Sequence, residues 1–150
     1  MTQKGKYVYD WPRPMVTVDA AVFAWVAGRA RLLLVQRKHD PYQGFWALPG
    51  GFVEIDEDLP DAAARELAEE TGLKGVPLEQ LHTFGRPGRD PRGRTISIVY
   101  FGIAGHDPQE AKAADDAADV QWFDIDNLPQ MAFDHDAIAR CAIAHLKGGS

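Results

Sequence analysis

Residues Gly50 to Leu73, GGFVEIDEDLPDAAARELAEETGL, decide how this chain folds. Glu66, Glu69 and Glu70 lie three and four residues apart, so an α-helix places their carboxylates on one face. Like charges on one helical face repel each other by roughly a few tenths of a kcal/mol per pair, so such a face is either solvated or bound to a cation. The preceding Pro49-Gly50-Gly51 is a turn that brings bare backbone close to a ligand. We interpret the stretch as a carboxylate cage for a hard divalent metal.

The ends of this helix are also readable from the sequence. Asp58 is a candidate cap, the helix is predicted to begin near Leu59, and Pro60 suits the first turn, where a missing N–H does no harm. Gly72 is expected to end the helix as a left-handed cap. Small and apolar residues keep its inner side thin, so we expect the helix to lie close to a sheet.

From Gly51 onward the residues fit the pattern G-x5-E-x7-R-E-U-x-E-E-x-G-U, in which U is a bulky aliphatic residue. The matching positions are Gly51, Glu57, Arg65, Glu66, Leu67, Glu69, Glu70, Gly72 and Leu73. This pattern resembles the signature of the Nudix hydrolases. The resemblance implies an α/β/α sandwich in which Glu66, Glu69 and Glu70 are the principal metal ligands and catalytic residues. It also implies that the Gly50 carbonyl is a further metal ligand. The residues that match the signature are called the box below, and the resemblance implies that Arg65 orients the box through a pair with Glu57.

The chemistry of this donor set favours magnesium or manganese, because both take oxygen ligands, and no His or Cys is present to suit zinc. Bound metal would cancel the repulsion between the glutamates and allow an acidic pocket to accept a diphosphate. Metals that bridge two phosphoryl groups also acidify an attacking water. We therefore predict hydrolysis of a phosphoanhydride. By the resemblance, the general base is either a box glutamate or an acid outside the box. Asp116 is the candidate outside acid, and a solvated loop aspartate is the alternative.

The composition is that of an ordinary globular protein: 150 residues fit one domain, 1–150, with 45% hydrophobic and 25% charged residues. A net charge of −6 argues against a general nucleic-acid binder. Cys141 is the only cysteine, which excludes a disulfide framework, and its helical setting indicates a core residue. The sequence shows no apolar leader and no membrane span, so we expect a cytoplasmic protein without membrane contact.

The remaining elements predict a mixed β-sheet covered by helices on both faces, an α/β fold. Strands are expected at Met15–Val26, Leu32–Val35, Gln80–Phe84, Thr95–Ile103 and Val120–Phe123, and the last helix is expected to start at 133–135. Residues 1–14 are expected to form an extended arm, whose Tyr7, Tyr9 and Trp11 are candidates for a pocket wall or a homodimer contact.

Substrate binding is predicted outside the box. The segment from Phe84 to Arg94 carries four arginines in an otherwise acidic chain, and arginine forks bind phosphate, although an exposed hairpin has the same composition. The substrate-binding candidates are Arg37, Arg86, Arg89, Arg92, Arg94 and Trp46. For Arg37 the alternative is a strand-end charge. Trp46, like Tyr42 and Phe45, is a candidate for stacking on adenine or for the core.

The run PGRDPRGRTISIVYF resembles a motif of bacterial ADP-ribose pyrophosphatases and of Nudix-related regulators of NAD metabolism, as do LPGGFVEIDEDL and Phe133-Asp134-His135. We therefore expect a small-molecule nucleotide substrate, ADP-ribose, cleaved to AMP and ribose 5-phosphate. The alternatives are an enzyme that removes oxidised nucleoside triphosphates and a non-catalytic ADP-ribose sensor. Such sensors carry a winged-helix domain, and the chain ends at Ser150, directly after the last expected helix. His135 is interpreted as a helix-start partner.

Overall fold

The computed structural model describes residues 7–106 and 117–148, which form seven strands and two helices. In chain order they are β1 (Met15–Val26), β2 (Arg29–Arg37), β3 (Trp46–Ala47), β4 (Gly50–Phe52), α1 (Leu59–Thr71), β5 (Glu79–Phe84), β6 (Thr95–His106), β7 (Ala117–Asp124) and α2 (His135–Leu146). Neither of the helices in this part of the chain is long and apolar enough to cross a membrane.

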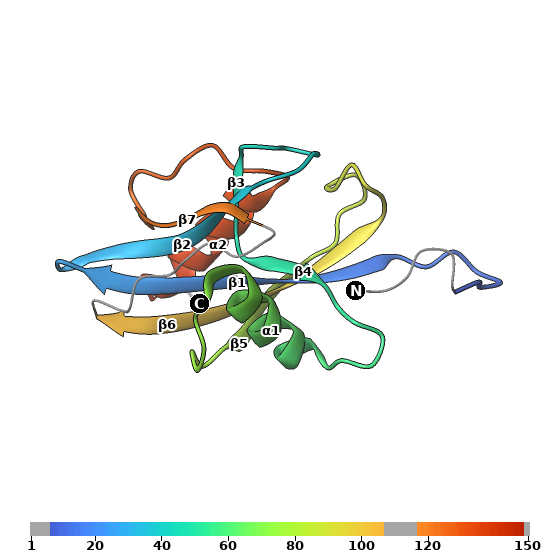
Figure 1. Ribbon diagram of the computed structural model, residues 1–150, viewed down its shortest axis with the longest axis horizontal. Coiled ribbons are helices and arrows are strands. Elements are labelled where there is room, and N and C mark those ends of the chain that lie inside the picture. Colours follow the sequence, from blue (N-terminus) through green and yellow to red (C-terminus); the bar gives the residue numbers. More distant parts are fainter. Residues whose placement is uncertain (1–6, 107–116, 149–150) are drawn as a thin grey trace.

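The strands form one mixed sheet with β1 near its centre (Figure 1). The main path runs β3-β2-β1-β6-β5, while β4 pairs with β1 and β7 pairs with β2. Among the seven described strands, β1 and β6 are the one parallel pair, and they lie side by side over most of their length. A parallel pair needs a long crossover. The segment between β1 and β6 supplies it and contains α1, which brings the acidic helix onto the sheet.

The two helices cover opposite faces of the sheet (Figure 1). Successive side chains of a strand point to opposite faces. On β1, Ala20 and Val22 therefore pack in the cluster that contains Leu67 of α1, whereas Ala21 and Phe23 pack in the cluster that contains Ile138 of α2. The predicted α/β class, a mixed sheet with helices on both faces, is confirmed.

Helix α1 has the ends that its sequence predicts. The Asp58 carboxylate accepts a hydrogen bond of 2.8 Å from the Leu59 N–H, and Pro60 occupies the first turn. Gly72 has a φ of +79°, and its N–H donates to the Ala68 carbonyl. These caps satisfy backbone groups that a helix end leaves unpaired. Because the caps depend only on local residue types, the boundaries of the helix follow from the sequence.

The glycine pair before α1 differs from the expected turn. Gly50 and Gly51 begin β4, which pairs antiparallel with β1, so that Gly50 lies opposite Asp19 and Gly51 opposite Val18. A Cβ at Gly50 would collide with the Val18 carbonyl and the Asp19 carboxylate. The bare backbone at Gly50 was expected to approach a ligand. In the structure it also allows β4 to lie close to β1.

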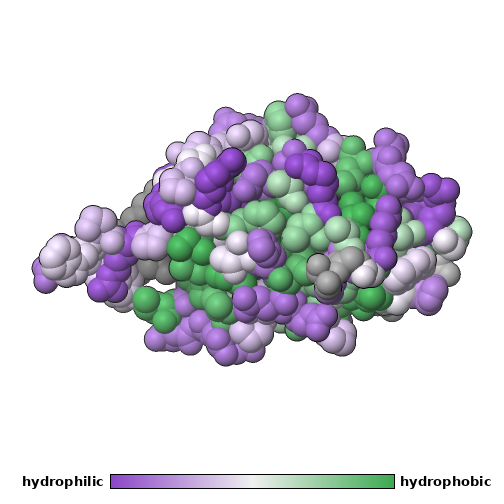
Figure 2. Space-filling view, turned by 180° about the vertical axis from the view of Figure 1, so that it is seen from behind, coloured by the Kyte–Doolittle hydropathy of each residue, from purple (hydrophilic) through white to green (hydrophobic). Residues whose placement is uncertain are grey.

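Residues 7–14 precede β1 without regular secondary structure and are exposed. They extend away from the body of the molecule, at the right in Figure 1 and at the left in the reverse view of Figure 2. Tyr9 contacts Arg13, whose guanidinium lies 3.7 Å from the ring centroid, and Trp11 is 78% exposed. The predicted role of this arm in a dimer stays a prediction.

Candidate active site

Two glutamates of α1, one helical turn apart, face two successive glycines of β4. The Gly50 N–H donates a 3.1 Å hydrogen bond to Glu70 Oε2. A Cβ added at Gly51 would lie only 2.6 Å from the Glu66 carboxylate. Real Cβ contacts are longer than this, so position 51 needs glycine for Glu66 to sit where it does. The third box glutamate, Glu69, is 56% exposed at its side chain.

Arg65 holds these carboxylates together from the same helix. Its Nε and Nη2 donate to Glu57 at 2.6 and 2.9 Å, and its Nη1 donates to Glu66 at 2.9 Å and to Glu69 at 3.1 Å. These bonds lower the pKa of Glu57. For Glu66, burial outweighs the attraction of Arg65 and raises the pKa of its carboxyl. The pair that the resemblance implied, Arg65 with Glu57, is present, and Glu66 is an incompletely compensated anion.

The donor chemistry of this region fits a hard divalent cation, which takes carboxylate and carbonyl oxygens. Within residues 7–106 and 117–148, no three His, Cys, Asp or Glu side chains converge as a ready-made metal site. The hydrogen-bond pattern explains this, because Arg65 binds Glu66 and Glu69 while the Gly50 N–H binds Glu70. Arg65 contacts Glu66 through Oε1, and a carboxylate has a second oxygen, so a cation can bind Glu66 without replacing Arg65. Asp116, the candidate outside acid, lies outside the described residues.

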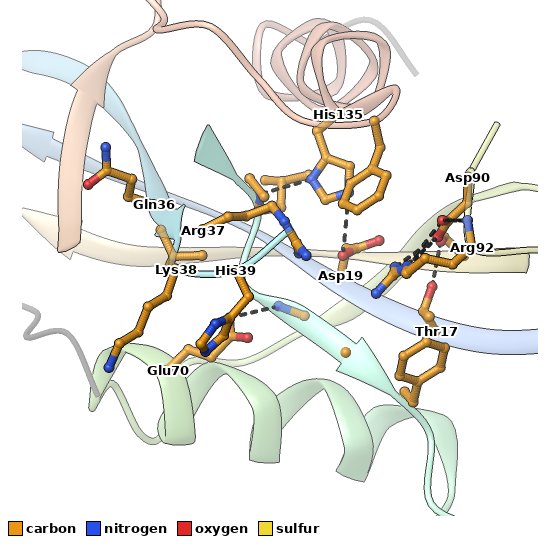
Figure 3. A pocket seen from close by; sticks show the side chains of 18 of the residues that line it. Thr17, Asp19, Gln36, Arg37, Lys38, His39, Glu70, Asp90, Arg92 and His135 are labelled. Carbon is orange, nitrogen blue, oxygen red and sulfur yellow. Dashed lines mark hydrogen bonds and ion pairs between the residues drawn. The ribbon is translucent and has the colours of Figure 1, made fainter. Parts of the chain in front are cut away.

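A cavity of about 280 Å³ opens beside the box, between the sheet and the start of α2 (Figure 3). It is lined by parts of β1, β2, β4, α1 and the arginine-rich segment 85–94. Its polar lining includes Thr17, Asp19, Gln36, Arg37, Lys38, His39, Gly50, Gly51, Glu70, Arg89, Asp90, Arg92, Ser97 and His135. The cavity therefore joins one end of the acidic box to several of the predicted substrate arginines.

The four arginines of the loop have different environments. Arg89 is 2% exposed at its side chain and donates to Asp134 at 2.8 and 2.7 Å and to Ser97 Oγ at 2.8 Å. Arg94 donates to the Gly85 carbonyl at 2.6 Å, and Arg86 is exposed. Neither Arg86 nor Arg94 is part of the cavity lining among the described residues. Only Arg89 and Arg92 of this group reach the cavity, and Arg89 is fully engaged within the protein.

Arg37 and Arg92 place two cations around one aromatic ring at the cavity. Each guanidinium carbon lies 4.9 Å from the ring centroid of Phe133, and that of Arg92 also lies 5.1 Å from Phe52. Burial and the neighbouring Arg92 lower the pKa of Arg37. In Figure 3 both side chains extend into the cavity, from opposite sides of Asp19.

Arg92 also donates to the buried Asp90 carboxylate at 2.8 to 3.3 Å, and Arg37 Nε donates to the Pro41 carbonyl at 2.7 Å. The two guanidinium groups can bind a phosphate group only through the N–H groups that these contacts leave.

Asp19 and His135 are the buried polar pair that our sequence reasoning did not assign to the site. The Leu48 N–H donates to His135 Nδ1 at 3.0 Å, so the proton of the neutral ring is on Nε2, which lies 3.9 Å from Asp19 Oδ1. Burial lowers the pKa of His135 to about 4 and raises that of Asp19 to about 7. The signal in the sequence was a single acidic residue inside the strand VTVDAAVFAWV, in which Thr17 is the only other polar residue.

None of the aromatic candidates Tyr42, Phe45 and Trp46 is among the described residues that line the cavity. Trp46 lies in β3, packs against the core on the α2 face and meets the Phe123 ring at 4.8 Å, edge to face. It is not among the described residues that line the cavity, which favours its alternative as a core residue. Tyr42 contacts the Phe133 ring at 4.9 Å. Cys141 is half-buried in α2.

The fold is a sheet between two helices, and the site sets a pair of glycines against glutamates of one helix. The family model for the NUDIX domain matches residues 16–146. This chain therefore belongs to the Nudix family. It is 46% identical over 128 residues to an ADP-ribose pyrophosphatase of Methanocaldococcus jannaschii, covering 85% of this chain and 72% of that protein. It is 35% identical over 141 residues to the ADPR responsive transcriptional repressor NtrR of Acinetobacter baylyi, covering 91% of this chain but only 56% of the repressor.

Solved structures give the same result. A MutT/nudix family protein from Enterococcus faecalis superposes with a TM-score of 0.85 at 32% identity, covering 95% of this chain and 66% of that one. The NUDIX domain of Shewanella oneidensis NrtR, crystallised with ADP ribose, also has a TM-score of 0.85 at 32% identity, covering 97% and 99%. The predicted family, fold and pyrophosphohydrolase class are confirmed.

Proposed function

We propose that this Nudix protein hydrolyses the pyrophosphate bond of ADP-ribose to AMP and ribose 5-phosphate, with Mg²⁺ or Mn²⁺ as its cofactor. The observation that carries the proposal is the single cavity that joins Gly50, Gly51 and Glu70 of the box to the guanidinium groups of Arg37 and Arg92. Water adds to one phosphorus, and the bond from that phosphorus to the bridging oxygen breaks. The bridging oxygen leaves with the other phosphate, so both products are phosphomonoesters.

Each group of residues has a separate task in this proposal. Glu66, Glu69 and Glu70, with the Gly50 carbonyl, would hold the divalent ion, which when bound polarises the phosphoryl groups and acidifies water. Arg37 and Arg92 bind phosphate oxygens and orient the diphosphate in the cavity. Arg65 and Glu57 hold α1 in position against β4. Asp116 stays a proposed outside acid, and the choice between it and a box glutamate as general base stays open.

The relatives support ADP-ribose over other nucleotides. The 46% identical archaeal protein is named as an ADP-ribose pyrophosphatase, and a bifunctional protein from Francisella tularensis with the same named activity, complexed with AMP and MN ion, superposes with a TM-score of 0.76 at 37% identity. An oxidized purine nucleoside triphosphate hydrolase of Danio rerio is 34% identical over 117 residues, which supports an oxidised nucleoside triphosphate as the alternative substrate. Because the enzyme named for ADP-ribose is the more similar, ADP-ribose is the preferred substrate.

A non-catalytic ADP-ribose-binding module is the second candidate, favoured by the 35% identity to the repressor. The box of this chain retains Glu66, Glu69 and Glu70, and the Gly50 N–H still contacts Glu70. A binding module does not need these carboxylates on one helix face, so we favour hydrolysis. We further propose a single domain, a homodimer, a cytoplasmic location and no nucleic-acid partner, as predicted from the sequence.

Purified protein incubated with ADP-ribose, other nucleoside diphosphate sugars and an oxidised deoxyguanosine triphosphate will separate the candidates. With Mg²⁺ or Mn²⁺ present, we expect the highest kcat/KM for ADP-ribose and equal amounts of AMP and ribose 5-phosphate by chromatography. Preferred hydrolysis of the triphosphate would support the alternative enzyme. Binding of ADP-ribose without any turnover would support the binding module and contradict our proposal.

A further inference from the structure

Asp90 is a buried carboxylate in the wall of a cavity that, in the proposed function, receives an anion. Its side chain is 4% exposed, and it lines the cavity together with Arg92. Burial acts against a charge here, yet the hydrogen bonds from Arg92 lower the pKa of Asp90, so its carboxylate is ionised at neutral pH. A fixed negative charge repels phosphate. Attraction of a diphosphate therefore does not explain why Asp90 is present.

The hydrogen bonds of Asp90 all lead to one residue. Its Oδ1 accepts from the backbone N–H of Arg92 at 2.9 Å and from Arg92 Nε at 3.1 Å. Its Oδ2 accepts from Arg92 Nη2 at 2.8 Å and from Nε at 3.3 Å. One oxygen thus closes a turn of the loop, and both oxygens bind one side of the guanidinium group. Figure 3 shows these bonds, with the Arg92 side chain extended from Asp90 into the cavity.

This side-on pairing leaves the outer edge of the guanidinium group available. An arginine has five N–H groups, one on Nε and two on each Nη. Asp90 binds the Nε–H and one N–H of Nη2. The three N–H groups that remain lie on Nη1 and Nη2. These two nitrogens form the edge with which an arginine binds two oxygens of one phosphate group.

Two aromatic rings restrict the plane of the same guanidinium group. Its carbon lies 4.9 Å from the ring centroid of Phe133 and 5.1 Å from that of Phe52. Phe133 has a φ of +52°, a left-handed value that is unfavourable for a bulky residue and that persists only where the surroundings hold it. The rings thus contact the faces of the group while Asp90 binds one of its sides, which leaves the outer edge for a ligand.

A second carboxylate competes for Arg92 in the same cavity. Asp19 also lines it, and its side chain is 7% exposed. Burial raises the pKa of Asp19 to about 7, and the charges of Arg89 and Arg92 act against this rise. An Arg92 side chain released from Asp90 is therefore expected to turn towards Asp19, which would occupy the N–H groups that a phosphate needs.

We propose that Asp90 is a positioning residue, which holds Arg92 side-on so that the N–H groups of its outer edge face the cavity and bind one phosphate group of the substrate. Asp90 itself does not touch the substrate. This inference rests on the proposed function and deepens it by naming the residue that prepares Arg92 for phosphate.

Asp90→Asn tests this role, because a positioning residue and a simple negative charge predict opposite effects. The Oδ1 of Asn can still accept from the backbone N–H of Arg92, whereas its NH₂ group takes the place of Oδ2 and meets the Nη2 donor. Removal of a negative charge alone would strengthen phosphate binding and lower KM. Loss of the side-on pairing should instead raise the KM for ADP-ribose by about 10- to 100-fold, the equivalent of one hydrogen bond to a charged group.

The rate constant and a matched control separate binding from other effects. Because Arg92 binds phosphate before and during the reaction alike, kcat of Asp90→Asn should stay within about threefold of the parent. The control is Asp40→Asn, an exposed residue whose charge also acts on Arg37 but whose carboxylate accepts from the Gln43 N–H. It removes the same charge without a grip on Arg92, so its KM should be unchanged or lower.

A double-variant cycle distinguishes positioning from a general loss of loop structure. If Asp90 acts through Arg92, then Asp90→Asn should raise KM no further once Arg92 is replaced by Ala. Multiplied effects of the two substitutions would give Asp90 an independent role and overturn the inference. A KM of Asp90→Asn equal to or below that of the parent would also overturn it. Asp90→Ser, whose hydroxyl can still close the turn, provides the same comparison if the Asn variant does not fold.

Failure of the proposed function is distinguishable from failure of this inference. If the parent prefers an oxidised nucleoside triphosphate, hydrolysis of ADP-ribose is wrong, and the cycle is measured with the triphosphate, which offers Arg92 the same kind of oxygens. If the parent binds ADP-ribose without cleaving it, dissociation constants from calorimetry replace KM. With either ligand, equal affinities of the parent and Asp90→Asn would show that Asp90 does not position Arg92.

Discussion

Arg89 and Asp134 are joined by two hydrogen bonds of 2.8 and 2.7 Å, although 45 residues separate them in the sequence. Asp134 is the residue before α2, and its side chain does not cap the helix. The pair instead ties the arginine-rich segment to the start of α2 and so fixes where His135 enters the cavity. We therefore interpret Arg89 as a residue that builds the cavity, in contrast to the substrate arginine expected from the sequence.

Replacement of Arg89 by Ala should destabilise the protein by about 3 kcal/mol, because it leaves a half-buried carboxylate without its cation. Urea unfolding measures this change. The control is Arg86→Ala, an exposed arginine of the same loop, for which we expect a change within about 0.5 kcal/mol. Normal stability of Arg89→Ala together with a raised KM for ADP-ribose would restore the substrate role.

Glu70→Gln should lower kcat for ADP-ribose by orders of magnitude while leaving the fold intact. The amide oxygen of Gln can still accept the hydrogen bond from the Gly50 N–H, so the contact between β4 and α1 is retained. What is lost is the charge that a divalent ion needs. Circular dichroism checks the fold, and calorimetry with Mn²⁺ checks the metal. A variant with near-normal rate and metal uptake would remove Glu70 from the metal site.

Gly51→Ala should displace Glu66, because the added methyl group would lie 2.6 Å from its carboxylate. We expect at least a tenfold loss of kcat/KM, since a misplacement of about 1 Å in a catalytic group can cost 10²-fold. Gly85→Ala is the matched control, because its added methyl group would meet nothing closer than 3.8 Å. Equal activities of the two variants would show that Glu66 does not depend on the close approach at position 51.

The buried neutral His135 predicts a loss of stability in acid. Its pKa is about 4 in the folded protein because of burial, against 6.5 when unperturbed. Between these values the unfolded chain binds a proton that the folded protein does not, so stability falls as the pH decreases through this window. From pH 7 to pH 4.5 the parent should lose about 2 to 3 kcal/mol more than His135→Gln, measured by urea unfolding.

The raised pKa of Asp19 acts in the opposite direction, because its folded form binds a proton more readily than the unfolded chain as the pH decreases below about 7. Asp19 is present in both proteins, so the comparison with His135→Gln isolates the histidine. Parallel pH profiles of the parent and the variant would contradict a buried neutral imidazole.

The sequence by itself determined α1, its two caps and the position of the box glutamates. These features depend on spacings of three to eight residues, which the geometry of one helix converts directly into neighbours. The contact between Arg65 and Glu57 belongs to the same local class. The order of strands and helices along the chain likewise predicted a mixed sheet covered by helices on both faces.

Only the tertiary structure decided which polar residues meet at the cavity. Asp19 and His135 are far apart in the sequence. They come together because β1 pairs with β4 while α2 packs on the face of the sheet opposite to α1. The same packing buries Arg89 against Asp134 and packs Trp46, partly buried, against the core. Residue type alone does not distinguish an arginine or a tryptophan that binds a ligand from one that packs within the protein. Its role is set by the long-range burial and pairing of strands and helices, which no local pattern encodes.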